Sequence, residues 1–138
     1  MTALAAARNT KQRTGDIADY PVKASTTCYQ GGIAVLNAGY AAPATAATGL
    51  IAIGRFEETA DNSAGAAGAI SARVQKGIFL FANSASTDLI AQAEVGAACY
   101  LVDDATVAKT DGTGTRSRAG HIVAVETAGV WVQIGLGV

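Results

Sequence analysis

The sequence predicts an all-β domain, a sandwich or a barrel, on three observations. Short apolar runs recur about every eight to twelve residues, which is the spacing of strands in sandwiches and barrels. Almost no segment carries the 3.6-residue apolar period of a helix. Sixteen glycines and a charged fraction of only 15% favour short turns and close backbone approaches. A chain of 138 residues is expected to form one domain.

The clearest element is a hairpin close to the C-terminus. Residues 130–134 read VWVQI, so apolar residues alternate with Trp131 and Gln133, as in a strand with one apolar face. Residues 121–125 form another β-like run, and the connection between the two runs ends in Gly129, which can adopt a positive φ. We therefore expect two paired strands, with Trp131 facing solvent, a second layer or a partner.

The longest β-like segment, residues 70–83, has a glycine in its middle that indicates a bend or bulge. Beyond this glycine, Ile78 and Leu80 fall on one face, and Phe79 and Phe81 fall on the other. A strand that is apolar on both faces is either covered on both sides or partly covered by a neighbouring subunit. Shorter strands are expected at residues 20–22, 26–29, 33–36 and 50–56.

Two connecting segments have distinct patterns. Residues 57–68 are small and polar and cannot build a packed core alone, so we expect a surface loop. Residues 91–95 are helix formers over about one turn, and Gly96 follows where a helix C-cap prefers glycine. We therefore expect one short helical turn before the strand that contains Cys99.

Residues 1–18 differ from the rest and are assigned as an N-terminal arm, with residues 19–138 as the β domain. Arg8, Lys11 and Arg13 precede any acidic residue, and no apolar period is visible. The segment is either a frayed terminus, as most domains have, or an arm that orders when its positive charges meet an acidic partner surface. Both interpretations stay open.

Composition excludes several classes of function. A net charge of −1 and a pI near 5.7 argue against a nucleic-acid-binding protein. No apolar run approaches the roughly 20 residues that cross a bilayer, and the start lacks the basic region of a signal peptide. We expect a protein made in a cytoplasm, without a membrane partner.

Cys28 and Cys99 form no CxxC pair and are expected to be small buried apolar residues, rather than a disulfide or a metal site.

Three features suggest chemistry, and each has a simpler interpretation. Asp103 and Asp104 have the groups for acid–base work or for binding a metal, but adjacent Asp residues are common in turns between strands. The loop at residues 112–116 superficially suggests phosphate binding, but it lacks the GxxxxGK[ST] spacing, and a hairpin loop fits better. Its tip, with Arg116 and Arg118, is available to touch a partner. His121 has no GxSxG nearby and is expected on a surface or an interface. We assign no catalytic, metal-binding or cofactor-binding residue, expect no cofactor, and expect no enzymatic activity.

Four stretches carry a resemblance to a known family. They are AGAISARVQKGIFLFANSA (67–85), VGAACYLVDDATVA (95–108), DGTGTRSRAG (111–120) and VETAGVWVQIG (125–135). Over residues 33–138 the chain resembles the small cement, or head-decoration, proteins of tailed bacteriophages. The resemblance implies a jelly-roll-like β-sandwich on the capsid exterior of a virion. It also implies that the protein binds the expanded head across junctions between major capsid subunits, as a symmetric homodimer or homotrimer, and stabilises the head.

Candidate partner contacts are assigned by residue type and position. They are Arg8, Lys11, Arg13, Phe79, Phe81, Arg116 and Trp131. Aromatic anchors such as Trp131 are enriched at the centres of interfaces. Two alternatives remain: a receptor- or glycan-binding β-module on the virion surface, and a small hydrolase that uses Asp103 or Asp104.

Overall fold

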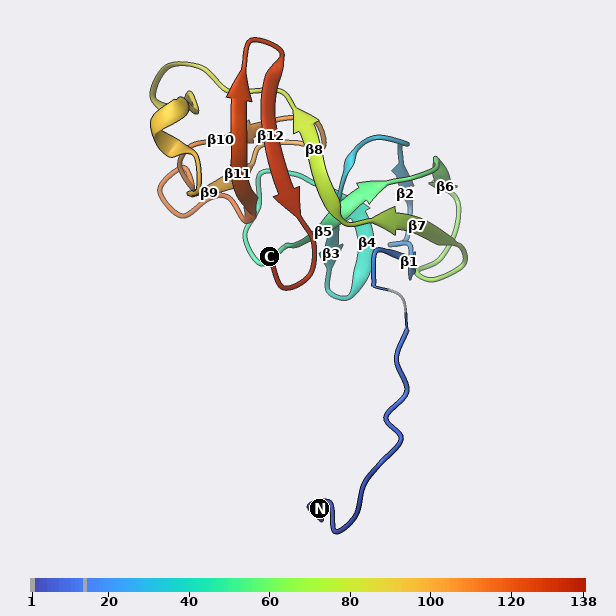
Figure 1. Ribbon diagram of the computed structural model, residues 1–138. Helices are drawn as coiled ribbons and strands as arrows, with labels where there is room; N and C mark the ends of the chain where they lie inside the picture. The colour runs from blue at the N-terminus through green and yellow to red at the C-terminus, as the bar shows by residue number, and fades with distance from the viewer. Residues whose placement is uncertain (1, 14) are drawn as a thin grey trace.

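The computed structural model of the protein describes residues 2–13 and 15–138. Two five-stranded sheets pack against each other, and a third, two-stranded sheet lies beside the first (Figure 1). The sequence prediction of an all-β sandwich is confirmed. Within the described residues the only helical segments are two single turns, and no helix is long and apolar enough to cross a membrane.

The first sheet comes from the N-terminal half of the chain. Its order is β1 (Ile17–Pro21), β7 (Ser71–Gln75), β5 (Ile51–Phe56), β3 (Ile33–Asn37) and β4 (Tyr40–Pro43), with antiparallel neighbours. Directly after β1, Val22 forms a parallel bridge with Ala41 of β4, so the two edges of the sheet meet. The sheet therefore curls toward a small barrel, flanked by the pair β2 (Thr26–Cys28) and β6 (Ala60–Asn62).

The second sheet comes from the C-terminal half. Its order is β10 (Val107–Ala108), β9 (Ala98–Leu101), β11 (Arg118–Glu126), β12 (Gly129–Ile134) and β8 (Gly77–Phe81). The predicted hairpin is confirmed, because β11 and β12 pair from His121 and Gln133 down to Glu126 and Gly129. Since each sheet takes its strands from one half of the chain, the order differs from the two Greek keys of a jelly roll.

The two sheets are joined at Lys76, between the last residue of β7 and the first residue of β8. The single bent strand expected over residues 70–83 is therefore two strands in different sheets. Gly77 begins β8, and a Cβ at this position would meet the ring of Phe79 closely. A residue without a side chain fits the point where the chain changes sheets.

Two apolar clusters stabilise this arrangement. One lies between the sheets and combines Ile33 and Val35 of β3 with inward residues of the second sheet such as Ile122 and Val132. The other lies inside the curled first sheet. Its members are Val22, Cys28, Ala34, Ala41, Ile53, Phe56, Ala60, Ala72 and Val74. Because neighbouring residues of β3 belong to different clusters, this strand is buried on both faces.

The connections agree with the sequence predictions in part. The helical turn expected at residues 91–95 is confirmed as the 3₁₀ turn η2 (Gln92–Glu94), and Gly96 beyond it has a φ of +93°. A second 3₁₀ turn, η1 (Ser86–Asp88), lies between β8 and η2. The loop predicted over residues 57–68 is wrong in one respect, because it contains β6. Asn62 of β6 is buried, and its side-chain amide donates to the carbonyl oxygens of Lys23 and Ala66.

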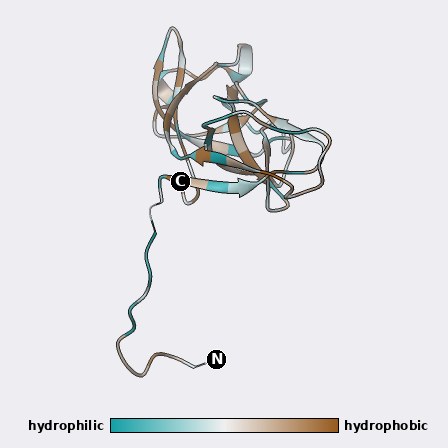
Figure 2. Ribbon diagram, turned by 90° about the vertical axis from the view of Figure 1, so that its right-hand side faces the viewer, coloured by the Kyte–Doolittle hydropathy of each residue, from teal (hydrophilic) through white to brown (hydrophobic). Residues whose placement is uncertain are grey.

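The N-terminal arm leaves the body as an extended, exposed segment (Figure 1). Its end was predicted at residue 18, but β1 already begins at Ile17 and pairs with Gln75. Met1 and Thr14 of the predicted arm lie outside the described residues. Colouring by hydropathy shows a hydrophilic middle and a more apolar end (Figure 2).

Candidate functional site

The first candidate surface is the arm. Every described residue from 2 to 13 is exposed, and the only hydrogen bond found within this segment runs from the Thr10 amide to the Arg8 carbonyl oxygen. Arg8, Lys11 and Arg13 have no ion pair with the described residues. Twelve extended residues reach about 40 Å. The arm therefore carries three free positive charges well beyond the body.

The second candidate surface is the side of the second sheet that faces away from the core. Strand residues alternate between faces, and the inward set, which includes Cys99, Ile122, Val130 and Val132, is buried against the first sheet. The remaining residues define what we call the outer face. They are Ile78, Leu80, Ala98, Tyr100, Arg118, His121, Val123, Ala124, Glu126, Trp131 and Gln133.

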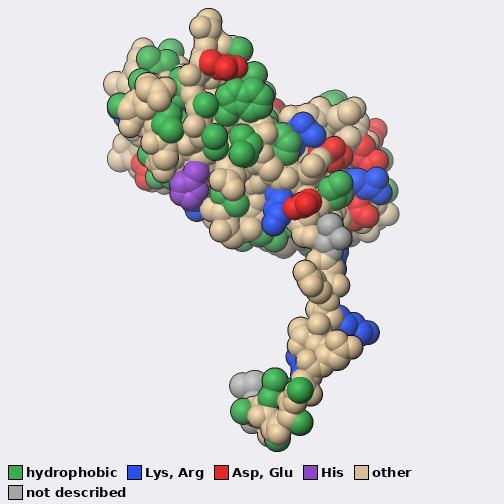
Figure 3. All heavy atoms as spheres, in the orientation of Figure 1, with side chains coloured by type: hydrophobic (Ala, Val, Ile, Leu, Met, Phe, Trp, Pro, Cys, Tyr) green, Lys and Arg blue, Asp and Glu red, His purple; other side chains and the backbone are tan. Residues whose placement is uncertain are grey.

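Apolar side chains occupy the centre of the outer face. Ile78 is 50% exposed, Leu80 38% and Val123 40%. Trp131 is half-buried and pairs with Ala124 on one side and Leu80 on the other. Figure 3 shows these hydrophobic side chains gathered over β8 and β12. The prediction that Trp131 points away from the apolar core of its strand is confirmed.

The phenylalanines of β8 lie on the opposite side. Phe81 is only 6% exposed and belongs to the cluster between the sheets, and Phe79 packs partly buried against the same cluster. Their rings are 6.4 Å apart in an edge-to-face arrangement. The sequence interpretation of these two residues as an exposed strand face is therefore wrong, and Ile78 and Leu80 take their place.

Arg116 is held by its own loop. Its guanidinium lies 3.2 Å from Asp88 Oδ2 and donates to the carbonyl oxygen of Thr110. The hydroxyl of Thr110 donates to Asp88, and this hydrogen bond, together with Arg116, lowers the pKa of the Asp88 carboxyl. The loop at residues 112–116 is thus anchored by Arg116 to the end of η1, which leaves little of this side chain for a partner.

The acidic pair at Asp103 and Asp104 forms the turn between β9 and β10. One carboxyl oxygen of Asp103 accepts a hydrogen bond from the Ala105 amide, and the carbonyl oxygen of Asp104 accepts one from Ile33. The prediction of a turn is confirmed. Among the described residues there is no group of three or more His, Cys, Asp or Glu side chains that could hold a metal ion.

Both cysteines are buried and free, as predicted. Burial raises the pKa of Cys28 to about 11, with a smaller contribution from Asp104. Burial also raises the pKa of Cys99 to about 12. Thiols with these pKa values stay protonated near neutral pH, so neither sulfur is an activated nucleophile.

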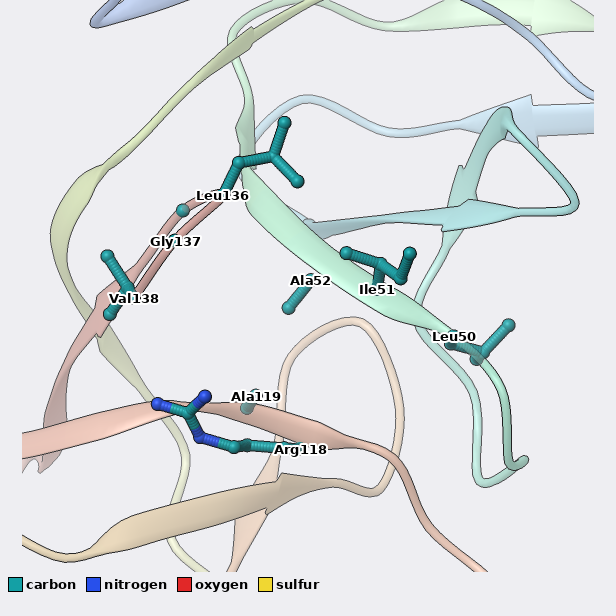
Figure 4. Close-up of a pocket in the computed structure, with 9 residues that line it drawn as sticks. Leu50, Ile51, Ala52, Arg118, Ala119, Leu136, Gly137 and Val138 are labelled. Carbon is teal, nitrogen blue, oxygen red and sulfur yellow. The ribbon is translucent and has the colours of Figure 1, made fainter.

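A pocket of about 170 Å³ lies where the C-terminal tail crosses between β5 and β11 (Figure 4). Apolar side chains and glycines line it, with Arg118 as the one charged residue. Its other lining residues are Leu50, Ile51, Ala52, Ala119, Gly135, Leu136, Gly137 and Val138. The lining side chains include no acid, hydroxyl or thiol, so they provide no nucleophile–base pair.

The sequence missed Ile78, Leu80 and Val123 as surface residues. The alternation within β8 separated the two faces correctly but did not say which face is outward, because both are apolar. Val123 is the extra residue of a bulge, since the register of β11 on β12 shifts between Ile122 and Ala124. No residue type in this strand marks a bulge. Had the pairing of β8 with β12 been known, the alternation within β12 would have shown which face of β8 points outward.

Comparison of the chain with family models, curated proteins and solved structures finds no match.

Proposed function

We propose that the protein is a structural component of a virion. It binds the outer surface of the expanded head of a tailed bacteriophage, across junctions between major capsid subunits, and stabilises the shell. The observation that carries the proposal is the arm: twelve described residues, all exposed, with three cations and no acid, attached to the β domain. The resemblance over residues 33–138 supports the same assignment.

The mechanism is thermodynamic linkage. A ligand that binds only the expanded shell stabilises that state by RT ln(1 + [L]/Kd), about 2.7 kcal/mol per site at a hundredfold excess over Kd. A homodimer or homotrimer that touches several capsid subunits binds the shell more tightly than a single copy does, because its second contact is intramolecular. The protein needs no catalytic group for this role.

The arm is suited to the first contact. Its cations attract an acidic surface before the body docks, which raises the association rate and makes it depend on salt. An extended segment that becomes ordered on its partner buries a large interface area for its length, but it loses conformational entropy when it binds. We therefore expect affinity to fall as salt concentration rises.

The experiment is co-sedimentation of the purified protein with expanded and unexpanded heads, over a range of salt. The proposal expects saturable binding to expanded heads only, at a fixed ratio to the major capsid protein. Binding to both forms alike, or to neither, would overturn it.

A charge-matched pair of variants tests the arm. Replacing Arg8, Lys11 and Arg13 with Gln removes three charges from the arm. Replacing the exposed Lys23, Arg73 and Lys76 with Gln removes three from the body. The arm variant should bind expanded heads at least about tenfold more weakly, with a flatter salt dependence, while the body variant should keep most of its affinity. Equal effects of the two variants would mean that only net charge matters.

A further inference from the structure

We propose that the outer face is a contact surface for a second copy of the same chain, packed face to face and antiparallel about a two-fold axis. The inference takes from the proposed function only the expectation that copies associate. It assigns that contact to one face and one symmetry. The argument rests on how the register orders the outer face into rows.

The register defines four outward rows along β11. Arg118 lies beside Tyr100 in the first row. His121, Gln133 and Ile78 form the second. In the third row, Ala124 lies beside Trp131, and Trp131 beside Leu80. Glu126, opposite Gly129, forms the fourth.

The two outermost rows carry opposite charges. Arg118 stands at one end of β11 and Glu126 at the other, and both are exposed. Neither forms an ion pair within the described part of the chain; the Nη2 atom of Arg118 lies 3.0 Å from Nδ1 of His121. Because two bulges interrupt β11, the two charges lie three rows apart, about 20 Å at 3.3 Å per partner residue, too far for them to pair in one molecule.

A two-fold axis in the plane of the contact, perpendicular to β11, exchanges these rows. It places Arg118 of each copy over Glu126 of the other, and Ile78 over Leu80. The ion pair and the apolar contact then each form twice, as an isologous interface requires. Parallel packing would instead set Arg118 against Arg118. The charge pattern thus selects the antiparallel arrangement.

The area of the outer face is small for a stable dimer. The four strands of the outer face, spaced about 4.8 Å apart and each contributing about six residues of 3.3 Å, give roughly 400 Å² per copy, or about 800 Å² in total. Stable interfaces bury about 1,200–2,000 Å². The dimer is therefore largely dissociated in dilute solution and largely formed where copies are concentrated on a shared surface.

Sedimentation equilibrium of the purified full chain, without capsids, gives the first readout. The expected result is a concentration-dependent monomer–dimer equilibrium. E126R or R118E should each weaken the dimer about tenfold by turning attraction into repulsion, and the double variant E126R/R118E should restore it.

Leu80→Ser should weaken the dimer, whereas Leu89→Ser, at a similarly exposed site off the outer face, should not. A monomer at every concentration, an assembly insensitive to these changes, or a double variant that stays monomeric would each overturn the inference.

Cysteine trapping supplies a second readout, which detects the contact even when only a small fraction of the protein is dimeric at equilibrium. Val123 lies between the two central rows, next to the axis, so V123C should form an intermolecular disulfide under mild oxidation. V95C is the matched control, because Val95 is as exposed but lies beyond η2. The native thiols do not compete, since both are buried. Equal cross-linking of V123C and V95C would contradict the two-fold arrangement even if a dimer exists. Because these experiments contain no capsid, their failure is distinguishable from a failure of capsid binding.

Discussion

The guanidinium carbon of Arg55 lies 4.3 Å from the centroid of the Phe79 ring, so a cation of the first sheet covers an aromatic ring of the second. Glu57 fixes the cation, because its Oε1 atom accepts hydrogen bonds from both Nη2 and Nε of Arg55, at 2.6 and 3.0 Å. Arg55 is thus shared between an ion pair with Glu57, just beyond the end of β5, and a cation–π contact across the sandwich.

A double-mutant cycle measures this contact between the sheets. Arg55→Met keeps the aliphatic stem and removes the charge, and Phe79→Leu removes the ring. We expect a coupling free energy of about 0.5–1 kcal/mol in denaturant unfolding. Arg73→Met is the control, since Arg73 is exposed and, among the described residues, forms an ion pair with Asp19 alone, at 3.6 Å. It should change stability by less than about 0.5 kcal/mol. Additive effects of the first two changes would show that the stacking contributes nothing.

Gly129 should not tolerate a side chain. Its φ is +149°, and a Cβ there would collide with the backbone carbonyl of Phe81 on β8. Gly129→Ala should therefore destabilise the protein by more than about 2 kcal/mol, through strain and the displacement of β8. Gly31→Ala is the matched control, because Gly31 also has a positive φ but open space around it. Its cost should stay near 1 kcal/mol. Equal costs in thermal unfolding would mean that the close approach is absent.

The cysteines should be nearly inert in the folded protein. For Cys28, raising the thiol pKa from 9.0 to about 11 lowers the thiolate fraction at pH 8 about a hundredfold. For Cys99, raising the pKa to about 12 lowers this fraction about a thousandfold. Burial adds a steric block. Titration with a thiol reagent should show almost no reaction at pH 8, and two equivalents after addition of denaturant. Fast labelling of either sulfur without denaturant would mean that its core opens readily.

Asp88 should contribute to stability above its unfolded pKa and lose that contribution in acid. The hydroxyl of Thr110, and then Arg116, lower the pKa of Asp88 in the folded state, so the unfolded chain takes up a proton first as the pH falls. Unfolding free energy should therefore decline as the pH drops below about 4, and less steeply in Asp88→Asn. Thr110→Val removes the hydrogen bond that contributes most to the lowered pKa of Asp88. The decline should therefore be less steep in this variant too. Identical pH profiles for all three proteins would contradict the assignment.

Removal of residues 2–13 should leave the body intact. The arm forms no hydrogen bond or ion pair with the described body, so its deletion should change the unfolding free energy by less than about 0.5 kcal/mol. Trypsin should cut first after Arg8, Lys11 and Arg13, where the chain is exposed and irregular. A large loss of stability on deletion, or protection of these three bonds, would show that the arm packs on the body in solution.

The fold class followed from sequence patterns that are local. Alternation in residues 130–134, a turn-forming Gly129 and a helix-ending Gly96 each act within a few residues, and all three predictions were confirmed. The orientation of β8 depends on a neighbour far along the chain, because both faces of this strand are apolar. Phe79 and Phe81 were placed outside on account of their type, but the pairing with β12 turns them inward. β6 was missed because a three-residue strand rich in small residues owes its existence to its pairing with β2.

Because β1 to β7 and β8 to β12 occupy consecutive stretches of the chain, the two sheets emerge from the ribosome at different times. Synthesis proceeds at about 5–20 residues per second, so the first sheet waits about 3–12 seconds for the rest of the sandwich. During that interval Ile33, Val35 and Ala52 lack the second sheet that covers them in the finished sandwich. Nascent chains on one message can meet through these bare surfaces. The greatest risk of misassembly therefore falls on the half-made protein.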